Sequence, residues 1–244
     1  MNGVSANIHF KPLRTNKYAK WFEEVQFNGK VLSDKEREEC VTVIDETLEQ
    51  FTQGLPTIYQ ALDIFNKRDT FHQIYRTITS VMIFVVMTMI DCLISCKYFI
   101  IADKDYDRRF MRGKMMVILN EGFKKLYGFD DKTHKKSEWY KLFPLMSYFP
   151  EEINRQYQDL TYLLEKHAKS SSWWKEERNL ETHLEATKLY MSRQEEIVES
   201  KVVIDSMKLY CSLMAVHDFL TNLHTCAYNY LVDKYNKGEL LITQ

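Results

Sequence analysis

One stretch decides the fold of this 244-residue chain: TFHQIYRTITSVMIFVVMTMIDCLISCKYFIIA, residues Thr70 to Ala102. It is rich in valine, isoleucine and threonine, which favour strands, but it runs for more than thirty residues without glycine or proline. Strands are rarely longer than about ten residues, so this length indicates a helix. Its middle is apolar nearly all round, which predicts burial on most sides.

The same stretch contains the longest run without a charge, from Thr77 to Ile90, and Asp91 ends it. Crossing a bilayer takes roughly 20 apolar residues, so we expect a buried helix and no membrane partner. The first thirty residues carry charges throughout and lack an apolar signal core, so we expect a cytoplasmic protein. Five cysteines, an odd number without a CxxC pair, fit that reducing compartment.

Helical spacing of apolar residues continues on both sides of this stretch. Ser33 and Glu36 form a capping-box pattern for a helix that we expect to end near Thr52, because Gly54 and Pro56 follow. Further helices are expected over about Thr57–Asn66, from the turn at Asp103–Asp107 to Tyr127 with Gly128 as the C′ residue, from Pro150 to the serines at 170–172, from Trp173 to about Arg193, and from near Glu195 to Lys237. Residues 129–149 are expected to form a charged loop followed by an aromatic stretch.

The last of these helices carries a seven-residue apolar seam that suits packing along a bundle axis or across a dimer. Its members are Leu209, Leu213, Val216, Leu220, Leu223, Ala227 and Tyr230. Only seven glycines and four prolines are present, which is little turn chemistry for a strand-rich fold. We therefore expect an all-α protein, a helical bundle of about four long helices with short accessory helices. Residues 1–244 would form a single helical domain, with residues 1–32 as an N-terminal arm packing on the bundle.

The charge balance is 33 basic against 34 acidic residues, a net charge of −1, so we expect no DNA partner. The chain lacks HExxH, GxGxxG and Walker patterns, and no histidine has a glutamate three residues before it. We therefore expect no metal and no cofactor. His217 and His224 lie on one face beside the seam, where histidines more often bind a neighbouring carbonyl or carboxylate than a metal.

Three polar residues interrupt the apolar helices, namely Asp91, Arg112 and Glu121. Burying charged groups is costly unless they pair. One interpretation is an ionic cross-link between adjacent helices. The other is a polar, substrate-binding pocket at the bundle centre.

One segment indicates chemistry, and it is RNLETH, residues 178–183. An arginine, a polar residue directly after it, and a histidine after four intervening residues resemble the R-x(4–6)-H motif of the HEPN superfamily (higher eukaryotes and prokaryotes nucleotide-binding), whose members are small helical bundles. The resemblance implies Arg178 and His183 as a catalytic pair, with Asn179 holding the histidine or the phosphate. It further implies metal-independent cleavage of RNA through a 2′,3′-cyclic phosphate. Some HEPN domains instead bind nucleotides or partner proteins.

The chemistry of the pair suits that reaction. An imidazole with a pKa near 6.5 exchanges protons with RNA hydroxyls near neutral pH, and a guanidinium donates two hydrogen bonds to a phosphate. Trp173 and Trp174 precede the motif and are placed to stack a base, although paired tryptophans at a helix start more often join a core. In the alternative interpretation, Arg178 pairs with a neighbouring glutamate and His183 packs against its own helix.

Residues five apart on a regular helix point about 140° apart, so Arg178 and His183 share a site only through an irregular first turn or a second chain. HEPN proteins do assemble sites across a dimer, so we expect a homodimer that binds RNA or a nucleotide. The alternatives are a non-catalytic helical dimerisation or interaction protein, and a small-molecule or nucleotide-binding helical bundle.

Overall fold

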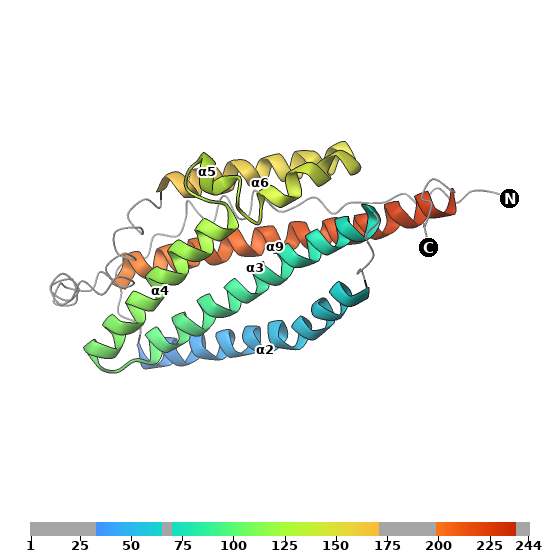
Figure 1. Ribbon diagram of the computed structural model, residues 1–244. Coiled ribbons are helices and arrows are strands. Elements are labelled where there is room, and N and C mark those ends of the chain that lie inside the picture. Colours follow the sequence, from blue (N-terminus) through green and yellow to red (C-terminus); the bar gives the residue numbers. More distant parts are fainter. Residues whose placement is uncertain (1–32, 65–69, 171–198, 238–244) are drawn as a thin grey trace.

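The computed structural model describes residues 33–64, 70–170 and 199–237. In these ranges the elements are α2 (Asp34–Ile64), α3 (Thr70–Ile101), α4 (Asp105–Leu126), α5 (Asp131–His134), the 3₁₀ helix η1 (Tyr140–Tyr148), α6 (Glu151–Ser170) and α9 (Glu199–Asn236). The described part contains no strand, and its long helices pack as a bundle (Figure 1). The predicted all-α fold class is therefore confirmed.

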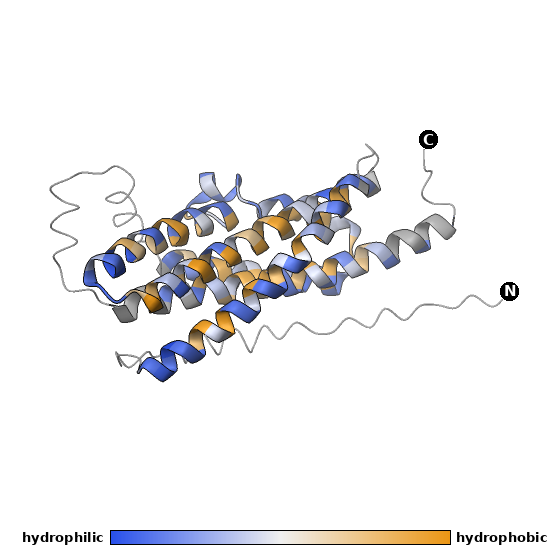
Figure 2. Ribbon diagram, turned by 90° about the horizontal axis from the view of Figure 1, so that it is seen from below, coloured by the Kyte–Doolittle hydropathy of each residue, from blue (hydrophilic) through white to orange (hydrophobic). Residues whose placement is uncertain are grey.

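The decisive stretch forms α3 at the centre of the bundle, where it packs against α2, α4 and α9. The apolar seam of α9 faces the inside of the same bundle, and its members from Leu209 to Ala227 are fully buried in the core. The seam was expected to pack either along a bundle axis or across a dimer, and the structure shows it packed within its own chain. In Figure 2 the first turns of α2 and the turn between α3 and α4 are hydrophilic, whereas the middle of the bundle is hydrophobic.

Among the described helices, α3 is long and apolar enough to cross a membrane, by length and composition alone, over His72–Ile101. However, 56% of its most apolar window is buried inside the bundle. Most of its surface therefore contacts protein, as in a core helix.

The expected break after Thr52 is wrong, because α2 continues to Ile64 with Pro56 inside it. Proline removes one backbone hydrogen bond and strains the preceding turn, but it does not prevent a helix that packing holds in place. Leu55 and Ile58, on either side of Pro56, pack against the core. The start of α2 agrees with the expected capping box, since Glu36 Oε2 accepts hydrogen bonds from Ser33 N at 2.8 Å and Ser33 Oγ at 2.7 Å.

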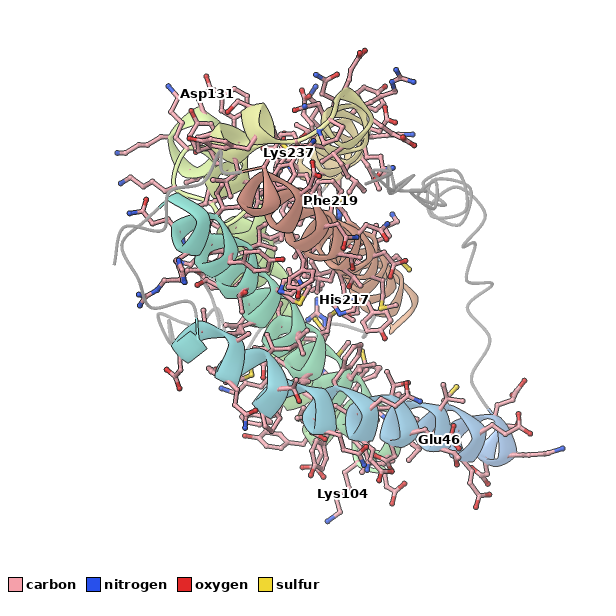
Figure 3. The ribbon with its side chains drawn as sticks, turned by 90° about the vertical axis from the view of Figure 1, so that its right-hand side faces the viewer. Glu46, Lys104, Asp131, His217, Phe219 and Lys237 are labelled. Carbon is pink, nitrogen blue, oxygen red and sulfur yellow. The ribbon has the colours of Figure 1, made fainter. Side chains whose placement is uncertain are left out.

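The region between α4 and α6 is more ordered than the expected loop. Asp130 and Thr133 form a capping box that starts α5, and the aromatic stretch forms η1. Trp139 at the start of η1 is fully buried, and its ring stacks on Tyr157 of α6 with centroids 4.7 Å apart. This region therefore joins the end of α4 to α6. Figure 3 shows Asp131 of α5 on one side of the bundle and Glu46 of α2 on the opposite side.

Gly128 occupies the expected C′ position of α4 with a φ of 90°. Its N–H donates to Phe123 O at 3.2 Å, and an added Cβ would lie 2.4 Å from the backbone nitrogen of His134. We expect Gly128→Ala to lower the free energy of unfolding by about 1–3 kcal/mol, because the backbone is left-handed and the space is filled. Urea titration measures this loss.

The matched control is Gly54→Ala in the exposed part of α2, where an added Cβ meets nothing within 4 Å. This change should raise the free energy of unfolding by about 0.5–1 kcal/mol, because alanine is the better helix former. Equal stabilities of Gly128→Ala and the wild type would contradict the assigned role of Gly128.

Candidate functional site

The residues expected to carry chemistry, Arg178, Asn179 and His183, lie outside the described residues, as do Trp173 and Trp174. The described chain stops on either side of them, at Ser170 in α6 and at Glu199 in α9. Both helix ends lie at the same end of the bundle, where α3 also gives way to α4 (Figure 1). In the sequence, the RNLETH segment lies between these two helix ends.

The three polar residues expected in the core lie in different environments. Asp91 and Glu121 are exposed, and Arg112 is half-buried. Neither carboxylate therefore lies at the bundle centre, because α3 and α4 each keep one side toward the surface. Burial by its neighbours still raises the pKa of the Asp91 carboxyl above its ordinary value.

A small crevice lies between α3, α4 and α9, near the end of the bundle where α9 begins. It has an empty volume of about 150 Å³ and is lined by Cys92, Ser95, Met115, Ile118, Leu119 and Ser206. That volume includes open solvent, and the space available to water-sized molecules is only about that of one water, so this crevice does not hold a nucleotide. Burial raises the pKa of the neighbouring Cys96 thiol to about 11, which leaves it protonated and a weak nucleophile at neutral pH.

His167 of α6 is the most deeply placed histidine of the described part. Its Nδ1 lies 3.0 Å from Ser212 Oγ of α9, and its ring lies 4.5 Å from the ring of Phe123. Burial and the nearby charge of Lys208 lower its pKa to about 3. Such an imidazole stays neutral near pH 7 and is too weak a base for general acid–base catalysis. His167 is therefore a packing residue.

The buried His167 makes stability depend on pH. It binds a proton at about pH 6.5 in the unfolded chain and at about pH 3 in the folded chain, so stability falls as pH drops from about 6.5 toward 3. Lowering the pH from 7.5 to 5 should therefore cost about 2 kcal/mol through this residue. Urea titrations at both pH values test this, with His167→Gln expected to lose about 2 kcal/mol less than the wild type. An equal loss in both proteins would contradict it, and His217→Gln, at a half-buried position on α9, is the control.

Glu138 is a buried carboxylate, but it has a structural partner on each side. Its oxygens lie 2.7 Å from Lys141 Nζ and 3.4 Å from Lys125 Nζ. Its backbone N–H also donates to Lys125 O at 2.8 Å. These contacts fix the start of η1 against the end of α4, so Glu138 is engaged in holding the fold.

The histidines beside the seam serve packing as well. The His217 ring meets the ring of Phe51 on α2, and the His224 ring meets that of Tyr75 on α3 with centroids 4.8 Å apart (Figure 3 labels His217). Within residues 33–64, 70–170 and 199–237, no three His, Cys, Asp or Glu side chains gather as metal ligands would.

Comparison of the chain with protein-family models, with curated proteins and with solved structures found no match. Among the described groups, Cys96, His167 and Glu138 are engaged in packing or ion pairs. The RNLETH segment, which follows α6 and precedes α9 in the sequence, remains the candidate for chemistry.

Proposed function

We propose that this chain is a HEPN-like endoribonuclease that cleaves RNA without a metal ion. The observation that carries the proposal is the combination of the Arg178-Asn179-x-x-x-His183 pattern with an all-helical bundle. In the sequence the pattern lies between α6 and α9, whose adjoining ends are at the same end of the bundle (Figure 1).

In the proposed reaction, His183 takes the proton of an RNA 2′-hydroxyl, and the 2′-oxygen attacks the adjacent phosphorus. The bond from phosphorus to the 5′-oxygen breaks, and that oxygen leaves with a proton returned by an imidazolium. The products are a 2′,3′-cyclic phosphate and a 5′-hydroxyl end. Arg178 donates two hydrogen bonds to the phosphate oxygens as their charge grows, and Asn179 holds the histidine or the phosphate.

A catalytic site that contains both Arg178 and His183 is more easily formed by two chains than by one. Arg178 and His183 point about 140° apart on a regular helix, so a second chain that supplies one of the two residues solves the geometry. The α9 seam does not supply that contact, because it is buried within its own chain. The proposed homodimer therefore uses another surface.

The experiment incubates the full chain with mixed RNA in excess EDTA and follows cleavage on denaturing gels. Arg178→Ala and His183→Ala should each lower the cleavage rate by at least about 100-fold. The matched control is Thr182→Ala, one residue away within the same segment, which should keep the wild-type rate. No cleavage by the wild type, or equal cleavage by His183→Ala, would contradict the proposal.

A further inference from the structure

The solvent-facing side of α3 carries an apolar stripe, whereas the solvent-facing side of a bundle helix is ordinarily polar. Its members are Met87, Ile94, Tyr98 and Ile101, which are 40%, 39%, 52% and 45% exposed. Their spacing of three, four and seven residues places them on one face of α3. This stripe occupies the C-terminal half of the helix. On one side of the stripe, Thr88 packs at Gly122 of α4. On the other side, Lys97 pairs with Asp45 of α2, so the stripe lies between α4 and α2.

One carboxylate lies within this stripe. Asp91 lies on the same face of α3 as Met87 and Ile94, and it is exposed. Its apolar neighbours leave it partly desolvated, so a basic group placed over it would gain more than at an open surface. The stripe therefore suits a partner that combines large apolar side chains with positive charge.

Residues 1–32 have that composition. They hold five basic and two acidic residues, a net charge of +3, in a chain whose total is −1. Aromatic residues alternate with the basic ones, as in Lys17-Tyr18 and Lys20-Trp21-Phe22. The segment is therefore complementary to the stripe in both charge and hydrophobicity.

The start of α2 brings this segment to the right place. Arg37 in the first turn of α2 donates from Nη1 to Ile100 O at 3.4 Å, so α2 begins beside the end of α3. Figure 1 shows the same arrangement. From Ile101 to Met87 the stripe is about 21 Å long, a distance that about seven extended residues span. A 32-residue segment that joins α2 at this point covers it easily.

We infer that residues 1–32 dock on the apolar stripe of α3, with arginine or lysine side chains over Asp91 and aromatic side chains between Met87, Ile94 and Tyr98. A second copy of the chain fits less well. Four half-exposed side chains offer on the order of 300–400 Å², whereas a stable interface buries about 800 Å² on each partner. The N-terminal arm predicted from the sequence, residues 1–32, would then bind this stripe of α3.

A zero-length carbodiimide cross-linker tests the docking in the full chain, because it joins a carboxylate directly to a contacting lysine. Mass spectrometry should find Asp91 joined to a lysine between residues 11 and 30, and Asp91→Asn should remove that product. An equal mixture of unlabelled and ¹⁵N-labelled chains shows whether the cross-link forms within one chain or between two. Docking within one chain gives cross-linked peptides that are both unlabelled or both ¹⁵N-labelled. Mixed-label pairs, or arm lysines joined only to other carboxylates, would overturn the inference.

A second measurement does not depend on the cross-link. Trypsin should cut after Lys17 or Lys20 at least about tenfold faster in Tyr98→Asp than in the wild type, because a charge in the stripe releases the arm. Tyr162→Asp, at a 72% exposed position on α6, is the matched control and should leave the rate unchanged. Circular dichroism verifies that both variants keep the helical fold. Equal cleavage of Tyr98→Asp and the wild type would also overturn the docking.

Discussion

Mixing two inactive variants, Arg178→Ala and His183→Ala, is expected to restore RNA cleavage to about a quarter of the wild-type rate. Each variant alone should lose at least about 100-fold, since one lacks the phosphate-binding group and the other the proton-transfer group. In a random mixture half of the dimers contain one chain of each kind. In such a dimer, one of the two sites combines the intact Arg178 of one chain with the intact His183 of the other.

The control for this experiment mixes His183→Ala with a chain carrying both substitutions, and it should stay inactive because no intact histidine is present. Subunit exchange is allowed to finish before RNA is added, and the rate is compared over several mixing ratios. A mixture that stays as inactive as its components would contradict a site shared between chains. Arg178 and His183 would then have to converge within one chain, through an irregular first turn of their helix.

The largest expected loss of stability comes from Trp139→Ala, at about 3–5 kcal/mol in the free energy of unfolding. Trp139 is fully buried, stacks on Tyr157, and donates from Nε1 to Thr161 Oγ1 at 2.9 Å. The backbone N–H of Trp139 donates to Leu126 O at 2.9 Å, and its ring centroid lies 5.5 Å from that of Phe219. The side chain thus joins α6 and α9, while the backbone is held to the end of α4, and removing the side chain leaves a cavity in the core.

Urea unfolding followed by circular dichroism measures this loss. Trp139→Phe is the graded control: it keeps most of the ring packing and loses the Nε1 hydrogen bond, so we expect roughly half the effect. Phe143→Ala, in the same 3₁₀ helix but 58% exposed, should change stability by less than about 0.5 kcal/mol. A loss below about 1 kcal/mol for Trp139→Ala would contradict its place in the core.

Much of the fold follows from the length and spacing of apolar runs. The α3 stretch and the α9 seam are too long and too regular for other elements, and the structure confirms both as core helices. The capping box at Ser33 and the glycine after α4 are local signals that need no tertiary contact, and both were predictable. The continuation of α2 through Pro56 was not, because packing of Leu55 and Ile58 on the core outweighs the local effect of proline.

The polar candidates were harder to place from sequence. Asp91 follows a long apolar run, which favours burial, but it falls on the one face of α3 that points outward. Helical period alone does not determine which face a neighbouring helix covers. The buried pair of His167 and Ser212 was missed for a related reason, since their contact joins residues 45 positions apart. Arg178 and His183 remain predictions of the sequence and lie outside the described residues.

The measurement that tests the central claim most directly compares two oligonucleotides of one sequence, one all-RNA and one with a 2′-deoxy sugar at the cleaved position. With the wild-type chain in excess EDTA, we expect the first to yield 2′,3′-cyclic phosphate and 5′-hydroxyl ends, detected by mass spectrometry. The second should stay intact at that position, because the attacking 2′-oxygen is absent. Cleavage of the deoxy substrate at the same bond, or no cleavage of the all-RNA substrate, would contradict a HEPN-like ribonuclease.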